Sequence, residues 1–115
     1  MPFDSEVNAV SRVALVLQRA RDKIKRRWCQ DDFYDEGAYC IVGAINSAYK
    51  SVEGQFPAGT IDQINSRVLK PFLDELGFDG ASEAIEFNDH ENDEGLRAHK
   101  KAILRRFDKA LDNLK

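Results

Sequence analysis

Apolar side chains recur every three or four residues over the first part of the chain. Between Ser5 and Arg27 the residues at this spacing are Val10, Val13, Ala14, Leu17, Ala20 and Ile24. This period is typical of an amphipathic α-helix, and Asp4 or Ser5 can cap its first turn. We therefore expect a first helix over residues 5–27, with Trp28 as a core anchor one turn beyond its last apolar position.

The next segment changes from polar to almost wholly apolar. Residues 30–38 are rich in Asp, Glu and Gly, which predicts a loop. Residues 40–45 are apolar on nearly every face, which is typical of a central, buried helix. We place this second helix from about Tyr39 to Val52, with Gly43, Ala44 and Ala48 allowing a neighbouring helix to approach closely.

Capping signals mark both ends of a third helix. Thr60 and Gln63 have the spacing of a capping box, which predicts a helix start at this point. Pro71 removes one backbone donor and should kink or split the helix near Arg67. Gly77 has the position of a left-handed C-terminal cap, which the following apolar residue would cover.

The last third of the chain predicts two more helices separated by an acidic loop. A short helix is expected over residues 79–87, a loop over residues 88–94 and a final helix from Gly95 to about Asn113. The expected inward stripe of the final helix is Leu96, His99, Ile103, Phe107, Ala110 and Leu114. No segment alternates with a period of two, so the predicted fold is all-α without a sheet, a single irregular bundle of four to five helices over residues 1–115.

Composition agrees with one packed domain. The chain has 115 residues, of which 43% are hydrophobic and 32% charged, and this mix excludes a wholly disordered or collagen-like protein. No apolar run approaches the ~18 residues of a membrane-spanning helix, and the first residues lack a secretory signal. We therefore expect a cytoplasmic protein that does not bind membranes, with Cys29 and Cys40 as reduced, unbridged thiols.

One set of residues has the types that cysteine-dependent catalysis needs. Cys40 stands at the head of a predicted helix, where the dipole favours a thiolate. His99 could accept the proton, Asn88 or Asp89 could orient the imidazole, and Gln30 could donate to an oxyanion, as in papain-like enzymes. The flanking signature of those enzymes and their strand-rich half are absent. The sequence therefore favours a buried, structural Cys40 and a His99 that is hydrogen-bonded at the edge of the core.

Metal and phosphate sites are not expected. Structural zinc ligands come in close pairs, whereas ten residues separate Cys29 from Cys40 and eight separate His90 from His99. A calcium loop that started at Asp89 would have acidic and basic residues where glycine and a bidentate Glu are needed. Glycine-rich phosphate loops are absent from the sequence, and we expect no cofactor.

Basic residues form two stripes that could follow a phosphate backbone. The first stripe holds Arg19, Arg21, Lys23, Lys25, Arg26 and Arg27, and the second holds Lys100, Lys101, Arg105, Arg106 and Lys109. The net charge is −3, and an acidic run adjoins each stripe. Those runs would repel nucleic acid, so solvated helix faces are favoured over nucleic-acid binding.

Four short stretches together resemble an uncharacterised family of short bacterial and phage proteins, a domain of unknown function. They are Trp-Cys-Gln at residues 28–30, the segment 40–48 with its Cys-x-x-Gly-Ala pattern, residues 85–89 and residues 107–111. This chain departs from the family pattern at Phe87, where Trp usually stands, and at Ala98, where Thr usually follows Arg. The resemblance implies a helical fold and a bacterial or phage origin, and no chemistry.

The residues of these stretches allow two interpretations of one polar group. Gln30, Asn88 and Asp89 stand beside the core anchors Trp28 and Phe87, so the polar side chains should meet. Asn88 and Asp89 could satisfy helix amides and Gln30 could satisfy loop carbonyls, for stability alone, which we favour. The same groups could instead line a small pocket roofed by Trp28 and Phe87.

Three functions remain open from the sequence. The first is a non-enzymatic helical module that binds an unknown protein partner or a second copy of itself. The second is a cysteine-dependent hydrolase or transferase that uses Cys40 and His99. The third is a nucleic-acid-associated regulator that uses the basic stripes.

Overall fold

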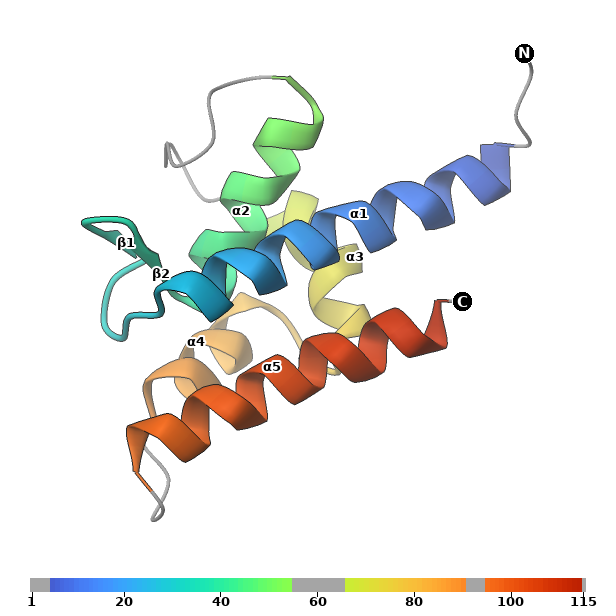
Figure 1. Cartoon of the computed structure of the whole chain (residues 1–115). Helices are drawn as coiled ribbons and strands as arrows, with labels where there is room; N and C mark the ends of the chain where they lie inside the picture. The colour runs from blue at the N-terminus through green and yellow to red at the C-terminus, as the bar shows by residue number, and fades with distance from the viewer. Residues whose placement is uncertain (1–4, 55–65, 91–94, 115) are drawn as a thin grey trace.

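The described part of the chain folds into five helices and one small hairpin (Figure 1). The structure is a computed structural model that describes residues 5–54, 66–90 and 95–114. Its elements are α1 (Ser5–Arg26), β1 (Tyr34–Asp35), β2 (Ala38–Tyr39), α2 (Ile41–Val52), α3 (Ser66–Glu75), α4 (Ala81–Asp89) and α5 (Leu96–Asn113). The all-α class and the helix count are thus confirmed, whereas the expectation of no sheet is wrong.

Helix α2 lies at the centre of the bundle. Its residues 41–48 are all buried, and it packs against α1, α3 and α4. The helix begins at Ile41, two residues later than expected, because Cys40 is its N-cap in an extended conformation. The Cys40 Sγ accepts a hydrogen bond from the Gly43 amide at 3.3 Å. The continuous apolar run therefore does mark a buried helix, as the sequence predicted.

The hairpin covers part of the predicted loop and also Tyr39, which was expected to begin the second helix. Strands β1 and β2 pair antiparallel, with Tyr34 opposite Tyr39. The turn between them has Glu36 and Gly37 at φ values of 47° and 89°, as a two-residue hairpin turn of type I′ requires. On its other side β2 forms a parallel bridge to Trp28. The hairpin is therefore attached to the chain just after α1.

The helix ends follow the sequence signals, with some shifts. Gly77 has a φ of 85°, and the Phe78 amide donates to the Leu73 carbonyl at 2.9 Å, which is the hydrogen bond of a Schellman cap. Within the described residues α3 is continuous from Ser66 to Glu75, so Pro71 does not split it there. The capping box at residues 60–63 lies outside the described residues. Helix α4 starts and ends two residues later than expected, which places residues 88–89 in its last turn.

The buried face of α5 agrees with its predicted stripe except at one end. His99, Ile103, Phe107 and Ala110 are buried. Leu114 packs against the core while partly exposed, but Leu96 in the first turn is 50% exposed. The prediction for Leu96 is therefore wrong, although His99 in the same turn is buried as predicted.

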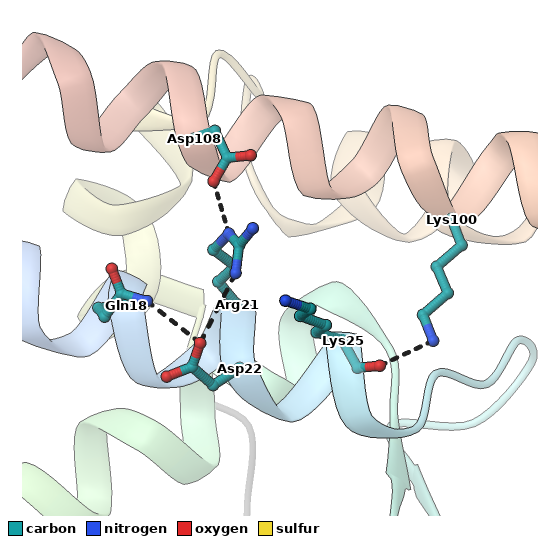
Figure 2. A network of polar contacts seen from close by, with 6 residues as sticks. All are labelled: Gln18, Arg21, Asp22, Lys25, Lys100 and Asp108. Atoms are coloured by element: carbon teal, nitrogen blue, oxygen red, sulfur yellow. Dashed lines mark hydrogen bonds and ion pairs between the residues drawn. The ribbon is translucent and has the colours of Figure 1, made fainter.

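Polar contacts join the last two turns of α1 to α5 (Figure 2). Arg21 pairs with Asp108 of α5, and also with its neighbour Asp22. The Lys100 ammonium donates to the carbonyl oxygen of Lys25 at 3.0 Å. This bond satisfies a carbonyl in the last turn of α1 that has no helical partner. Among the described helices, none is long and apolar enough to cross a membrane.

Candidate functional site around Asn88

The side chain of Asn88 forms the centre of a buried polar cluster. It lies in the last turn of α4 and is fully buried. Its Oδ1 accepts hydrogen bonds from Trp28 Nε1 at 2.8 Å and from the Ile41 amide at 3.0 Å. Its Nδ2 donates to the carbonyl of Cys29 at 3.1 Å and to Asp89 Oδ1 at 2.9 Å. One amide thus joins α4 to the chain after α1 and to the start of α2.

Gln30 and His99 close the end of α4. Gln30 Nε2 donates to the Asn88 carbonyl at 3.0 Å. His99 Nε2 lies 2.6 Å from the Phe87 carbonyl oxygen and 3.2 Å from that of Asn88. Because a carbonyl oxygen only accepts, Nε2 must carry the proton. Gln30 Nε2 and His99 Nε2 therefore satisfy carbonyl groups at the end of α4. Both nitrogen atoms are already engaged in these hydrogen bonds.

Rings and a carboxylate complete the cluster. The His99 ring lies between those of Trp28 and Phe87, with centroid distances of 5.5 and 5.4 Å. Asp89 Oδ1 accepts the amide of Asp31 at 3.0 Å. The structure therefore brings together Gln30, Asn88, Asp89 and His99, four of the five residues of the catalytic hypothesis.

Cys40, the fifth residue, is bonded elsewhere. It is 4% exposed, and burial raises the pKa of its thiol to about 11, although the amides of Gly43 and Val42 act in the opposite direction. In the part of the chain that the structure describes, no hydrogen bond joins Cys40 to His99. A thiolate at Cys40 would thus lack both solvation and a base in contact with it.

The surfaces around the cluster belong to different pockets. Trp28 and Gln30 line one pocket with Lys100, whereas Phe87 and His99 line a pocket of about 460 Å³ beside α4 and α5. A third pocket, of about 180 Å³, is lined by Asp31, Asp32, Phe33, Cys40, Ile85 and Asp89. The fully buried Asn88 lines none of these three. Three different pockets are therefore lined by Trp28 and Gln30, by Phe87, and by Asp89, although these residues lie close together.

The candidate metal ligands do not converge either. Cys29 and Cys40 are free thiols, and Cys29 Sγ donates to the Asp32 carbonyl at 3.4 Å. Across residues 5–54, 66–90 and 95–114, no group of three or more His, Cys, Asp or Glu side chains is arranged to hold a metal. The pair His90 and His99 lines the pocket beside α4 and α5 without such a group.

Sequence reasoning missed two exposed aromatic residues on the hairpin. Residues 31–36 are all exposed, and the side chains of Phe33 and Tyr34 are 38% and 39% exposed. Four carboxylates surround them, from Asp31, Asp32, Asp35 and Glu36. We call these six residues the acidic hairpin surface. Two adjacent aromatic residues inside an acidic run were the available signal.

The backbone beneath this surface is firmly held. The carbonyl of Phe33 accepts the Cys40 amide at 3.3 Å, and it lies so close to Gly43 that any Cβ there would overlap it. Arg27 Nη1 donates to the carbonyl of Glu36 at 2.8 Å. Together with the bond from Asp31 to Asp89, these contacts fix the hairpin on α1, α2 and α4.

Comparisons with known proteins give a family and no function. No curated protein and no solved structure matches the chain. One family model, described as a family of unknown function (DUF6197), matches residues 9–112 and so spans nearly every element of the fold. The chain therefore belongs to the DUF6197 family.

Proposed function

We propose that this protein is a non-enzymatic protein-interaction module that binds its partner through the acidic hairpin surface. One observation carries the proposal: Phe33 and Tyr34 stand exposed and adjacent on a backbone fixed by its neighbours. Aromatic side chains are enriched at interface centres because they bury a large area at a small entropic cost. The sequence features further suggest a cytoplasmic protein of bacterial or phage origin.

The charge around the two aromatic residues indicates the kind of partner. In the described structure, no ion pair reaches the carboxylates of Asp31, Asp32, Asp35 or Glu36. Unpaired carboxylates attract cationic groups and speed association with a basic surface. The expected partner surface therefore carries Lys or Arg next to apolar residues.

The hydrogen bonds of the polar cluster indicate that Asn88 and its neighbours position the hairpin. All four hydrogen bonds of the Asn88 amide go to groups of the protein itself. Three of these groups belong to residues 28–29 and 41, which flank the hairpin. The cluster thus positions the hairpin, and this role accounts for its polar atoms without catalysis.

Selection from a random-peptide library tests the proposal without a known partner. Peptides are selected on the wild-type protein and their affinities are then compared with those for the double variant Phe33→Ala, Tyr34→Ala. We expect Lys or Arg beside apolar residues in the recovered peptides, and a loss of affinity of about tenfold or more in the variant.

The matched control is Leu15→Ala, because Leu15 is 42% exposed on α1 and lies outside the hairpin. Peptide affinity should be unchanged in this variant. Peptides that bind the wild type and the double variant equally would contradict the proposed surface, as would a selection that enriches no basic residues.

A further inference from the structure

A basic groove adjoins the acidic hairpin surface. It is lined by Arg19, Asp22, Lys23, Arg26 and Ser51, from α1 and the last turn of α2. We call this the basic groove. Lys23 Nζ lies 5.1 Å from the ring centroid of Tyr39, and the Tyr39 ring lies 5.1 Å from that of Tyr34. The two surfaces of opposite charge therefore meet through Lys23, Tyr39 and Tyr34, where the hairpin lies beside the end of α1 (Figure 1).

Among the described residues, the carboxylates of the acidic hairpin surface and the three cations of the basic groove form no ion pair, whereas Asp22 of the groove pairs with Arg21. Arg27 reaches the hairpin, but it donates to a backbone carbonyl and not to a carboxylate. The acidic and the basic surface thus lie side by side without neutralising each other.

After burial, charges of each surface also contribute to the pKa shift of a nearby group. The pKa of Lys23 is lowered by burial and then by the charges of Arg26 and Arg19. The pKa of Cys29, behind the hairpin, is raised by burial and then by four carboxylates, with Asp35 first among them. Potentials of opposite sign therefore persist on the two adjoining surfaces.

We propose that the partner of the acidic hairpin surface is a second copy of this chain, whose basic groove receives it in a two-fold symmetric dimer. The inference rests on the proposed interaction function and names the partner of the same surface. A two-fold axis places each hairpin against the groove of the other copy, so both contacts form at once and the assembly closes.

Charge complementarity favours a second copy over an unrelated basic protein. An unrelated partner would neutralise the carboxylates but leave Arg19, Lys23 and Arg26 unpaired. A second copy neutralises both surfaces and places Phe33 and Tyr34 between them, away from water. Because the attraction is between exposed charges, association should be strong at low salt and weak at high salt.

Charge reversal on each surface tests the pairing by sedimentation velocity. The acidic surface is reversed in the variant Asp32→Lys, Asp35→Lys, and the basic groove in the variant Arg19→Glu, Arg26→Glu. Each variant alone places like charges against each other, so we expect its self-association to fall about tenfold or more. An equimolar mixture restores opposite charges at both contacts, so the mixture should dimerise like the wild type.

Matched controls reverse the same number of charges at exposed positions outside both surfaces. They are Glu83→Lys with Glu86→Lys on α4, and Lys101→Glu with Arg105→Glu on α5. These variants should dimerise like the wild type in about 0.02 M salt, and all dimers should dissociate in about 0.5 M salt. Thermal melts check folding, and the single variants Asp32→Lys and Arg19→Glu replace any double variant that fails to fold.

The outcomes separate this inference from the proposed function. A wild-type protein that stays monomeric at low salt overturns the dimer, as do reversals that leave dimerisation unchanged or a mixture that fails to restore it. If peptide binding still depends on Phe33 and Tyr34 in that case, the interaction function stands with a different partner. If the wild type dimerises but peptide selection enriches no basic residues, the dimer stands, and the hairpin serves self-association alone.

Discussion

At the scale of single residues, the side chain of Asn88 joins three segments of the chain through its hydrogen bonds. Replacing Asn88 with Ala removes the acceptor of both Trp28 Nε1 and the Ile41 amide. A buried donor left unsatisfied costs about 1–3 kcal/mol, so Asn88→Ala should lower the free energy of unfolding by about 2–6 kcal/mol. Urea unfolding measures this loss.

The control for this prediction is Asn113→Ala, an exposed change in the last turn of α5. It should alter the free energy of unfolding by less than about 0.5 kcal/mol. Equal effects of the two substitutions would show that the hydrogen bonds of Asn88 contribute little to stability.

A second prediction at this scale concerns the reactivity of Cys40. A thiol whose pKa is raised to about 11 by burial is almost wholly protonated at neutral pH, so few molecules carry the reactive thiolate. In a Cys29→Ser background, alkylation of Cys40 should be slow in the folded protein and fast after denaturation.

The pH dependence of the labelling rate distinguishes a structural Cys40 from a catalytic one. Because the raised pKa moves thiolate formation to higher pH, the labelling rate of folded protein should still rise above pH 9. Rapid labelling near pH 6 that disappears in His99→Ala would instead identify a Cys40–His99 pair and favour the cysteine-dependent enzyme.

Sequence reasoning reached part of this residue-scale picture. The expectation that Gln30 meets Asn88 followed from their positions beside apolar anchors, and the structure joins them at 3.0 Å. The sequence did not predict that Asn88 Oδ1 accepts hydrogen bonds from both Trp28 Nε1 and the Ile41 amide at the start of α2. Those contacts depend on how three distant segments pack, which local patterns do not encode.

At the scale of elements, Gly43 sets the distance between α2 and the hairpin. Alanine is better than glycine within a helix by about 1 kcal/mol, so propensity alone predicts that Gly43→Ala is stabilising. Here its Cβ would overlap the Phe33 carbonyl oxygen, which is backbone and cannot rotate away. We therefore expect Gly43→Ala to displace the hairpin and to lower the free energy of unfolding.

Hydrogen exchange locates the effect of this substitution. The amide of Cys40 donates to the Phe33 carbonyl at 3.3 Å, so it should lose protection in Gly43→Ala. Ser82→Ala, at an exposed position of α4, should leave that amide protected. A Gly43→Ala protein that is more stable and equally protected would show that the hairpin moves at no cost.

Element by element, the sequence predicted the helices better than the hairpin. Gly77 marked the end of α3 because a left-handed cap needs glycine, and the apolar run marked α2. Strands of two residues are too short to show alternation, so β1 and β2 gave no periodic signal. Their turn places Glu36 at positive φ, where Asn or Asp is the usual sign of a hairpin.

At the scale of the whole molecule, α1 connects most of the fold. It packs against α2, α3, β2 and α5, so the first and last helices lie together (Figure 1). Trp28, just after α1, is hydrogen-bonded to Asn88 of α4, and its ring is tilted against the ring of His99 of α5. The ring of the only tryptophan therefore contacts elements from both halves of the chain.

This arrangement predicts cooperative unfolding of the entire molecule. Tryptophan emission reports the contacts of Trp28 with α4 and α5, whereas far-ultraviolet dichroism reports all helices. The two urea transitions should coincide because no described helix buries its apolar face without the others. An emission change at lower urea than the dichroism change would instead show that the hairpin end unfolds separately.

The bond between Lys100 and α1 gives a matched pair of variants for the same experiment. Lys100→Met removes the donor to the Lys25 carbonyl, while Lys101→Met changes the exposed neighbour by the same chemistry (Figure 2). Lys100→Met should lower the free energy of unfolding by about 0.5–1.5 kcal/mol and shift both transitions together. Lys101→Met should leave the urea midpoints of both the emission and the dichroism transition unchanged. If Lys100→Met moved only the dichroism transition, α5 would separate from α1 before the region around Trp28 unfolds, and the two long helices would not belong to one cooperative unit.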